Sequence, residues 1–483
     1  MKIRNLRWWI IALVFLAAVL NYIDRQTLSA LAPTIQKDLN MDDHDYANVV
    51  NIFLVAYTLA YLISGKIVDR LGTRTGTMIF VIWWSIANML TAAAQGMRSM
   101  SSFRFMLGLG EAGIWPAASK VVSEWFPPRE RALAIGIYTM GATIGATMAP
   151  YVVIPLATHP YEQTVPFLHD LFGGHSAGWR LAFIITGAAG LLWLIPWLIF
   201  YRKPRENSMI TTAELAIIEE TDAQAEQDDQ TAGKANIESA NLADAETPWT
   251  WKQVLTFRAT WLLLFGRLLT DPVWYFYQFW FAKFLSSERH VAQQDLTMTW
   301  VIYAAAGVGS LFGGWWSGHW IKKGLAPANG RMRVMLFSAC LLPLSPWIAS
   351  ATNMNTTLAL TIVAVFASLV WLINISSLVV DLVPKHSLGT VFSVVAAGST
   401  FGGIIMNAIV ASMVSGPSTK PAGFLDQGIK FITGPLLELV QGQGYGSWFL
   451  IMAFLHPLAW LMLYFGGVLR PAAPVPNGLT PHR

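Results

Sequence analysis

The stretch WWIIALVFLAAVLNYIDRQ, residues 8–26, places an apolar run long enough to cross a membrane directly before two charged residues, Asp24 and Arg25. An ionised side chain at the centre of a bilayer costs about 2.5 to 3.5 kcal/mol on insertion scales, so such residues are rare there and usually functional. If the helix ended at Tyr22, both charges would lie in water. If it continues, they lie within the membrane, and the rest of the chain must decide between these interpretations.

The composition is that of a membrane protein. Of the 483 residues, 54% are hydrophobic and only 12% are charged, about half the charged fraction of a soluble domain. The 22 Trp and 26 Phe residues fit aromatic belts at the membrane surfaces. The net charge of +4 comes from short loops and gives no reason to expect nucleic-acid binding. The single cysteine, Cys340, excludes an intrachain disulfide, and we expect no metal site.

Apolar runs of roughly 20 residues, each able to span a 30 Å hydrocarbon core, recur along the chain. They lie near residues 8–31, 47–68, 75–95, 100–125, 133–156, 179–201, 260–285, 297–319, 333–351, 357–381, 389–414 and 447–469. We therefore expect an all-α membrane protein with twelve transmembrane helices in two pseudo-symmetric six-helix bundles, residues 1–201 and 257–470. A polar cytoplasmic linker, 202–256, would join them, and a cytoplasmic tail, 471–483, would follow.

Basic residues and an internal repeat indicate the topology. Lys and Arg gather before the first helix, in alternate short loops and after the sixth helix, which places both termini and the linker in the cytoplasm. The first helix has no signal-peptide cleavage site and is retained. EWFPPRERA (124–132) and DLVPKHSLG (381–389) occupy equivalent places in the two halves. Duplicated six-helix halves are a transporter plan in which substrate binds near the midplane between the halves.

Helix arithmetic places three charges at compatible depths. Asp24 lies sixteen residues after Trp8, about 24 Å into the membrane, and Arg104 lies about 7 Å below the opposite surface. These two opposite charges therefore come to nearly the same depth. Glu111 follows Arg104 by seven residues, close to two turns, so both share one helix face and Glu111 lies near the centre. We expect the three side chains to face a common cavity.

Other polar residues lie inside predicted helices. Tyr57 is near the centre of the second helix, and Arg267 and Asp271 are one turn apart in the seventh. That pair either binds substrate or satisfies itself. Asn374 and Ser399 lie inside the tenth and eleventh helices, where each could contact a ligand or form a bond between helices.

Three motifs resemble signatures of the major facilitator superfamily: GKIVDRLGTR (65–74), RFMLGLGEA (104–112) and GATIGATMAP (141–150). Within it, NYIDRQTLSALAPTIQKDL, GEAGIWPAASKVVSEWFPPRERA and RLLTDPVWYFYQFWFAKFL resemble the anion:cation symporter branch. That branch holds bacterial proton-coupled transporters of sugar acids such as hexuronates, galactonate and glucarate. The Arg267–Asp271 pair followed by Pro272 resembles the hexuronate transporters in particular.

The resemblance implies roles for individual residues. Asp24 and Glu111 would be the protonatable groups, with Arg104 as the partner that they exchange. The substrate carboxylate and hydroxyls would meet Arg25, Tyr22, Tyr57, Arg267, Asp271, Asn374 and Ser399. An inner gate would be formed by Gly65, Asp69, Arg70 and Arg74, with Asp69 facing the start of the eleventh helix. The sequence departs from the branch at Gly318 and His319, where Asp and Arg are usual, and at Ala142, where some relatives have glutamine.

The expected function is inward, proton-coupled symport of an organic anion such as glucuronate or galacturonate across the bacterial inner membrane by a monomer. Its partners would be the small anion and the bilayer, with no cofactor besides the coupling proton. The alternatives are another carboxylate such as galactonate or glucarate, antiport, coupling to sodium, and a sensor that does not transport. An enzyme is not expected, because the nine histidines show no ligand-spaced pair on one helix and no Ser/His/Asp group lies at one depth. An ATP-driven pump is not expected, because no phosphate-binding loop is present.

Overall fold

The computed structural model describes residues 2–126, 128–159, 177–218, 251–383, 388–416 and 442–469. These parts of the chain are helical and contain no β-strand. Eight of the helices within them are long and apolar enough to span a membrane. The all-α membrane fold predicted from the sequence is therefore confirmed, while the total of twelve spans stays a prediction.

Within the described residues, the N-terminal half has seven long helices and one short one. In chain order they are α1 (Leu6–Ala30), α2 (Ala32–Asp38), α3 (Asp43–Leu71), α4 (Thr73–Thr91), α5 (Met97–Glu111), α6 (Ile114–Trp125), α7 (Pro128–Thr158) and α10 (Ala177–Phe200). A short 3-10 turn, η1 (Pro204–Glu206), follows at the start of the linker.

The C-terminal half repeats this plan. Its elements are α12 (Trp251–Thr256), α13 (Arg258–Phe279), α14 (Phe281–Glu288), η2 (Gln293–Thr299), α15 (Trp300–Lys322), α16 (Pro327–Leu341), η3 (Leu342–Leu344), α17 (Pro346–Ser350), α18 (Met354–Leu382), α19 (Leu388–Ser415) and α21 (Gly444–Phe465). Each of the twelve predicted ranges falls on one helix or on consecutive helices. Four ranges are divided: 100–125 at Gly113, 260–285 at Trp280, 297–319 between η2 and α15, and 333–351 at the Leu342–Leu344 turn.

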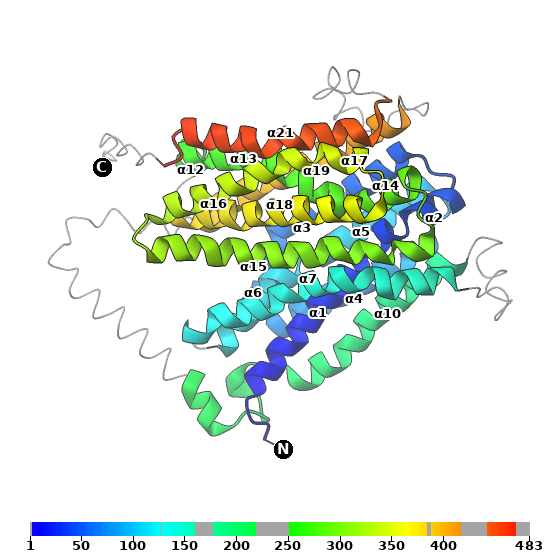
Figure 1. Cartoon of the computed structure of the whole chain (residues 1–483). Coiled ribbons are helices and arrows are strands. Elements are labelled where there is room, and N and C mark those ends of the chain that lie inside the picture. Colours follow the sequence, from blue (N-terminus) through cyan, green and yellow to red (C-terminus); the bar gives the residue numbers. More distant parts are fainter. Residues whose placement is uncertain are drawn as a thin grey trace.

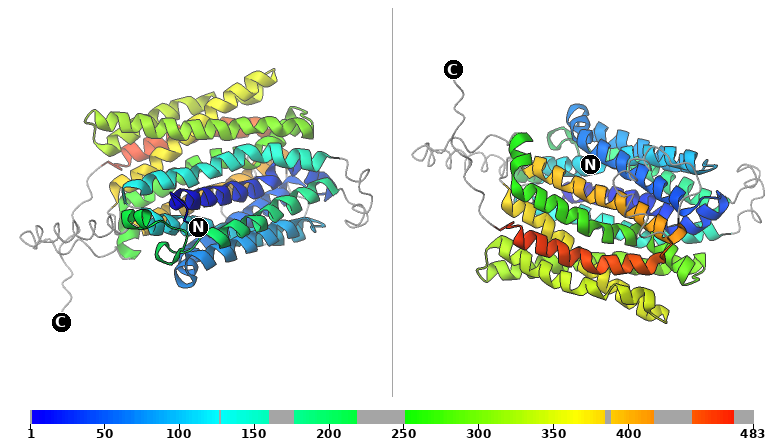
Figure 2. Two further views of the ribbon diagram at one scale, coloured as in Figure 1. Left: turned by 90° about the horizontal axis from the view of Figure 1, so that it is seen from below. Right: turned by 90° about the horizontal axis from the view of Figure 1, so that it is seen from above.

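The two halves lie one above the other, with their helices running along a shared direction (Figures 1 and 2). Within the N-terminal half α1 packs on α7 and α3 on α5, and within the C-terminal half α13 packs on α19 and α15 on α18. The halves meet where α3 contacts α19 and where α7 contacts α15. Because these pairings correspond helix by helix, the halves are related by approximate two-fold symmetry.

Glycines explain the closest helix contacts in each half. A methyl group on Gly141 or Gly145 of α7 would overlap backbone carbonyls of α1 at Phe15 and Val19. A methyl group on Gly398 or Gly402 of α19 would likewise overlap the α13 carbonyls of Leu264 and Leu268. Small residues four apart let two membrane helices approach backbone to backbone, so the repeated pair reflects the same packing in both halves.

Polar contacts between the halves gather at one end of the bundle. In the described segments, the hydrogen bonds and ion pairs between the halves join residues 26–51 to residues 278–416. This is the end marked by α2 and α14, opposite α12 (Figure 1). The basic-residue pattern predicts that it faces the outside.

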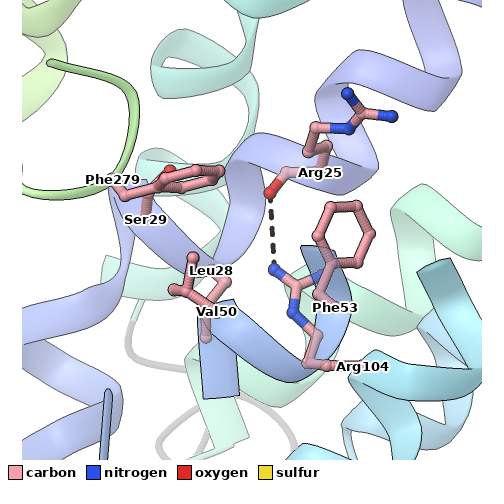
Figure 3. A pocket seen from close by; sticks show the side chains of 7 residues that line it. All are labelled: Arg25, Leu28, Ser29, Val50, Phe53, Arg104 and Phe279. Atoms are coloured by element: carbon pink, nitrogen blue, oxygen red, sulfur yellow. Dashed lines mark hydrogen bonds between the residues drawn. The ribbon is translucent and has the colours of Figure 1, made fainter. Parts of the chain in front are cut away.

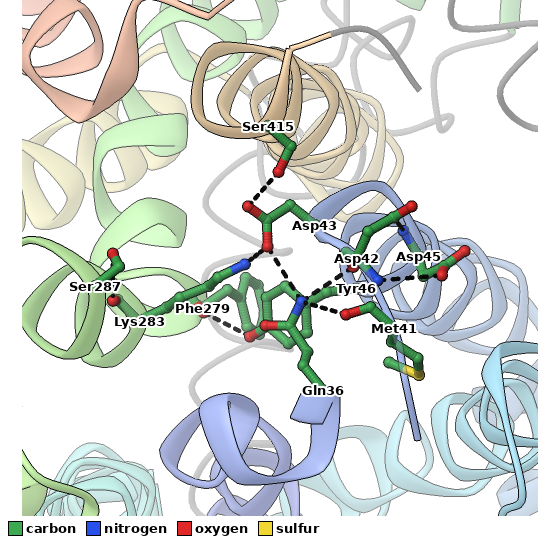
Figure 4. A network of polar contacts seen from close by, with 10 residues as sticks. All are labelled: Gln36, Met41, Asp42, Asp43, Asp45, Tyr46, Phe279, Lys283, Ser287 and Ser415. Atoms are coloured by element: carbon green, nitrogen blue, oxygen red, sulfur yellow. Dashed lines mark hydrogen bonds and ion pairs between the residues drawn. The ribbon is translucent and has the colours of Figure 1, made fainter. Parts of the chain in front are cut away.

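Figure 4 shows some of these contacts, made by residues that we call the outer seal: Asp43, Tyr46, Phe279, Lys283 and Ser415. Asp43 of α3 pairs with Lys283 of α14 and accepts a hydrogen bond from Ser415 of α19 at 2.5 Å. The Tyr46 hydroxyl donates to the backbone oxygen of Phe279 at 2.5 Å. A buried ion pair and these bonds hold the halves together at this end.

The beginning of the linker is attached to the N-terminal half. Glu214 is 3% exposed, and its carboxylate accepts bonds from the backbone N–H groups of Leu6 and Arg7 at 2.9 and 3.0 Å. These N–H groups lie in the first turn of α1 and have no acceptor within the helix, and a negative charge is favoured at this end of a helix. Arg7 also pairs with Glu214 at 3.0 Å and with Glu130 at 2.9 Å. Residues 219–250, which are most of the predicted linker, and 471–483, the whole predicted tail, lie outside the described residues.

Candidate substrate and coupling-ion site

The segment NYIDRQ lies within α1, which continues to Ala30. The interpretation in which the helix ends at Tyr22 is therefore wrong; between the start of α1 and Pro33 the sequence has no Pro or Gly to break the helix. Asp24 is 0% exposed, and Arg25 is also largely buried. Both charges must find their partners inside the protein.

Arg25 pairs with Glu111 between α1 and α5. Its Nε donates to Glu111 Oε2 at 2.8 Å, and its Nη2 lies 2.8 Å from the same oxygen. The guanidinium also lies over the rings of Tyr22 and Tyr57, at 4.8 and 4.7 Å from their centroids. Aromatic faces attract a cation, so Arg25 sits in an aromatic cage closed by a carboxylate.

Arg104 has a different environment. It is 3% exposed and donates through Nη2 to the backbone oxygen of Arg25 at 3.4 Å, whereas its Nε and Nη1 have no hydrogen-bond partner. Its charge lies near the rings of Phe53 and Phe183, at 5.7 and 5.9 Å. Within the described parts of the chain no carboxylate pairs with it. A buried guanidinium with free donors is suited to receive an anion.

Arg25 and Arg104 line the same cavity (Figure 3). Its lining combines these two arginines with one hydroxyl and four apolar side chains: Arg25, Leu28, Ser29, Val50, Phe53, Arg104 and Phe279. The volume of this cavity is about 10 Å³, which is room for about one water molecule. A sugar acid therefore enters only after the helices around this cavity move apart.

Asp24 and Glu111 were expected to exchange Arg104 as their partner, but each contacts a different residue. Asp24 Oδ1 accepts a bond from Asn88 Nδ2 at 2.7 Å, and Glu111 is held by Arg25. In this conformation Arg104 therefore pairs with neither acid, although all three side chains are buried in the same half. The coupling roles of Asp24, Glu111 and Arg104 and the substrate role of Arg25 stay predictions.

In the C-terminal half, Arg267 pairs with one oxygen of Asp271, and the other oxygen, Oδ1, is buried without a hydrogen-bond partner. Arg267 Nε and Nη2 both lie 2.8 Å from Asp271 Oδ2, within one turn of α13. Asn374 Nδ2 donates to the backbone oxygens of Gly313 and Val370 at 3.1 and 2.8 Å, so its amide joins α18 to α15. The Ser399 hydroxyl donates to Tyr275 Oη at 3.5 Å. The Asn374 contact is thus of the helix-packing kind that the sequence left open.

The predicted inner gate is described only in part. Arg74 Nη2 donates to the backbone oxygen of Leu198 at 2.5 Å, a contact within the N-terminal half. Arg70 is exposed, and Gly65 faces Pro116 with room for a methyl group. The Asp69 side chain lies outside the described residues, so its expected contact with the start of α19 stays a prediction.

Sequence reasoning missed neutral polar residues around the charges. Asn88 binds Asp24, and Gln26 joins the halves by accepting from Tyr303 Oη at 2.7 Å and donating to Gln278 Oε1 at 3.4 Å. Lys283, which pairs with Asp43, was also missed. The available signal was a lone amide or ammonium inside an apolar run, because such a group needs a partner in the membrane.

The chain matches a known protein family and is similar to transporters of known substrate. The family described as Major Facilitator Superfamily matches residues 14–407. The hexuronate transporter of Escherichia coli (strain K12) is 31% identical over 316 residues, which cover 65% of this chain and 66% of that transporter, just under two thirds of its length. The galacturonate transporter of Dickeya chrysanthemi is 30% identical over 315 residues, 65% of this chain and 82% of that protein.

A more distant relative and a solved structure extend the coverage. The D-galactonate transporter of Escherichia coli O6:H1 is 27% identical over 428 residues, 86% of this chain and 91% of that protein. A bacterial homologue of the human lysosomal transporter Spinster, in an inward-facing and unoccupied conformation, matches with a TM-score of 0.71 and 19% identity, covering 98% of this chain and 100% of that one. The structural match concerns the fold.

Proposed function

Because the chain belongs to the Major Facilitator Superfamily, we propose that it carries a sugar acid, and specifically a hexuronate, inward together with protons by alternating access. The family and its relatives make the chain a multi-pass transporter of the bacterial inner membrane that carries a small molecule and is not an enzyme. Hexuronate as substrate, proton coupling and inward direction are the proposal. So are monomeric function and cytoplasmic termini.

The observation that carries the proposal is that two arginines line one cavity and differ in whether a carboxylate already binds them. Arg25 is held by Glu111, and Arg104 offers two unpartnered nitrogens. Guanidinium binds a carboxylate with two parallel hydrogen bonds, which matches the acid group of a uronate. Tyr22 and Tyr57 lie against Arg25 and can reach substrate hydroxyls once the cavity opens.

Charge balance links the anion to a proton. Arg25 and Arg104 contribute two positive charges, and ionised Asp24 and Glu111 contribute two negative ones. A substrate monoanion adds a negative charge to this buried group, and one proton on either acid restores neutrality. Burial favours the protonated form of a carboxyl group, whereas contact with a guanidinium favours the ionised form. A proton on Glu111 therefore loosens Arg25, which then becomes available to the substrate.

Stoichiometry sets the driving force. With one proton per monoanion the cycle is electroneutral, and each pH unit contributes about 1.4 kcal/mol. If Asp24 and Glu111 both take protons, one net positive charge moves inward and adds about 2.3 kcal/mol per 100 mV. Uptake of a monoanion driven by a membrane potential without a pH gradient distinguishes the two schemes, because only the second responds.

Uptake into proteoliposomes tests the proposal. The purified protein should accumulate labelled glucuronate or galacturonate when the outside is acidic, and a panel of unlabelled galactonate, glucarate and neutral glucose should compete in proportion to their fit. Binding without uptake would favour a sensor, and acceleration by a trans anion alone would favour an antiporter. Strong competition by galactonate with none by glucuronate would move the substrate to the alternative class that the galactonate relative supports.

A further inference from the structure

A chain of neutral polar side chains joins the two halves beside the cavity that the two arginines line. It runs through α1, α13 and α15, and all of its members are buried, with exposed fractions between 1 and 7%. None of them carries a charge, so none takes part in the charge balance between the anion and the proton. We call these residues the amide–hydroxyl cluster: Gln26, Ser29, Gln278 and Tyr303.

Hydrogen bonds connect the members of the cluster. Gln26 Oε1 accepts from Tyr303 Oη at 2.7 Å and from Ser29 Oγ at 2.8 Å. Gln26 Nε2 donates to Gln278 Oε1 at 3.4 Å, which is long beside the usual N–H···O distance of about 2.9 to 3.0 Å. The amide of Gln26 is therefore the centre of the cluster, and its oxygen is better satisfied than its nitrogen.

The register of α1 places the cluster next to the residues that are expected to bind the substrate carboxylate. Tyr22, Arg25, Gln26 and Ser29 follow one another at intervals of three, one and three residues, so they form one stripe along the helix. Ser29 lines the same cavity as Arg25 and Arg104 (Figure 3). A ligand held there by its carboxylate therefore meets the Ser29 hydroxyl, and the Gln26 amide is bonded to that hydroxyl.

The cluster supplies the chemistry that sugar hydroxyls need and that the arginines lack. A hydroxyl both donates and accepts hydrogen bonds, whereas a guanidinium only donates. In the part of the chain that the structure describes, Ser29 is the only residue lining the cavity whose side chain can accept a hydrogen bond. The amides of Gln26 and Gln278 offer acceptor oxygens and paired donor hydrogens directly behind it. Hydroxyl hydrogens of a substrate therefore find their acceptors in this cluster.

Another amide pair shows what a contact that only joins the halves looks like. Asn407 Nδ2 donates to Asn51 Oδ1 at 2.7 Å, and neither residue lines the cavity. The contact between Gln26 and Gln278 is longer and therefore weaker. These two glutamines thus retain hydrogen-bonding capacity that the hydroxyls of a ligand can use.

We propose that the amide–hydroxyl cluster recognises the hydroxyl groups of the substrate and so selects polyhydroxylated carboxylates over plain ones. The proposal rests on the proposed function in that the ligand is a sugar acid. When the cavity opens and the substrate binds, its hydroxyls replace the bonds that the cluster makes with itself. A carboxylate without hydroxyls leaves the separated amides unpaired. A site built to hydrogen-bond a hydroxyl strongly rejects an analogue that lacks it for this reason.

Two ligands that differ mainly in their hydroxyl groups measure this role. Cyclohexanecarboxylate has a carboxylate on a six-membered ring, like galacturonate, but it carries no hydroxyl. Binding of each to the purified full-length protein is measured by titration calorimetry, and the readout is the ratio of their dissociation constants. A role in holding the halves together changes both constants alike, whereas a role in recognition changes their ratio.

Three variants remove groups from the cluster, and a fourth is the control. Gln26→Leu should lower the preference for galacturonate at least about tenfold, equal to 1.4 kcal/mol, chiefly by weakening galacturonate binding. Ser29→Ala should lower it by a smaller factor. Tyr303→Phe removes one hydroxyl at nearly unchanged shape and replaces Gln26→Leu should that variant fail to fold. Asn407→Leu breaks an amide contact between the halves away from the cavity and should leave the ratio unchanged.

The proposal is overturned if the folded cluster variants keep the wild-type ratio, or if Asn407→Leu lowers it as much as they do. Its failure is separable from that of the proposed function. Equal binding of both ligands by the wild type would refute hydroxyl recognition and leave transport of a carboxylate intact. Selective binding of galacturonate without uptake into proteoliposomes would refute the transport and retain the role of the cluster. Binding of neither ligand would refute both.

Discussion

Each half of the molecule holds a buried arginine–carboxylate pair, and the two pairs differ in which helices they join. Arg25 and Glu111 join α1 to α5, whereas Arg267 and Asp271 lie one turn apart on α13. Both pairs have contacts of 2.8 Å. A pair between helices breaks when the helices separate, but a pair within one helix moves with it as a unit. The N-terminal pair is therefore the one suited to sense a conformational change.

The two pairs also differ in the charged residues that lie beside them. Beside Arg25 and Glu111 lies Arg104 with unused donors, so a carboxylate entering the cavity has a partner available and a competitor to displace. Arg267 has its carboxylate on the adjoining turn. We therefore expect the Arg25–Glu111 pair to affect transport and the Arg267–Asp271 pair to affect mainly stability.

The largest effect is expected for Glu111→Gln. This change removes the charge that holds Arg25 and the group that would take the proton, so accumulation driven by a gradient of one pH unit should fall from about tenfold to none. Exchange of substrate across the membrane should persist, because both arginines remain. Glu288→Gln, at an exposed position of α14, is the control and should behave as wild type. Accumulation retained in Glu111→Gln would show that Glu111 is not a coupling group.

Breaking the C-terminal pair should mainly affect stability. Asp271→Asn leaves the Arg267 charge buried without its partner, which costs about 3 to 5 kcal/mol in comparable cases. Replacing both, as Arg267→Met with Asp271→Leu, removes the uncompensated charge and should recover most of the loss. Thermal unfolding of the three proteins checks this. If the double variant is no more stable than Asp271→Asn, the pair does more than satisfy itself.

Arg25→Lys should weaken substrate binding by an intermediate amount. Lysine keeps the charge but loses the planar pair of donors, and one charge-assisted hydrogen bond contributes about 1.5 to 3 kcal/mol. The KM for the sugar acid should therefore rise roughly ten- to a hundredfold. Arg267→Lys serves as the comparison and should change KM less. Equal effects at the two positions would remove the contrast between the halves.

The smallest effect is expected at the outer seal. Lys283→Met removes the partner of Asp43 and should favour opening of that end by about 1 kcal/mol, roughly fivefold in the equilibrium. Spin labels at exposed Gln95 and Thr352, in a Cys340→Ser background, report the distance between the halves there. Lys322→Met at the opposite end is the control. An unchanged distance distribution in Lys283→Met would mean that the ion pair does not stabilise the closed end.

The fold followed from the sequence because the bilayer imposes strong length and polarity rules. The charges in NYIDRQ, RFMLGLGEA and GRLLTD stood out for the same reason, since charged residues are rare in membrane helices. Breaks within helices were missed at Gly113 and Trp280, because the apolar pattern continues across them. Hydropathy records that a segment is buried, and a short irregular turn changes it very little.

The partners of the charges were harder to predict. Helix arithmetic gave depth along the membrane and brought Asp24 and Arg104 to one level, but it could not give the rotation of each helix about its axis. That rotation turns Arg25 toward Glu111 and Asp24 toward Asn88. Asn88 itself attracts little notice in a sequence, because a neutral amide is tolerated in a membrane helix far more readily than a charge.

Proton movement during transport tests the central claim most directly. Liposomes containing the protein and a pH-sensitive dye are given glucuronate or galacturonate from outside, with no initial pH gradient and with the membrane potential clamped at zero. The account predicts that the interior acidifies together with substrate entry and that Glu111→Gln abolishes this acidification. Substrate entry at an unchanged internal pH would contradict it.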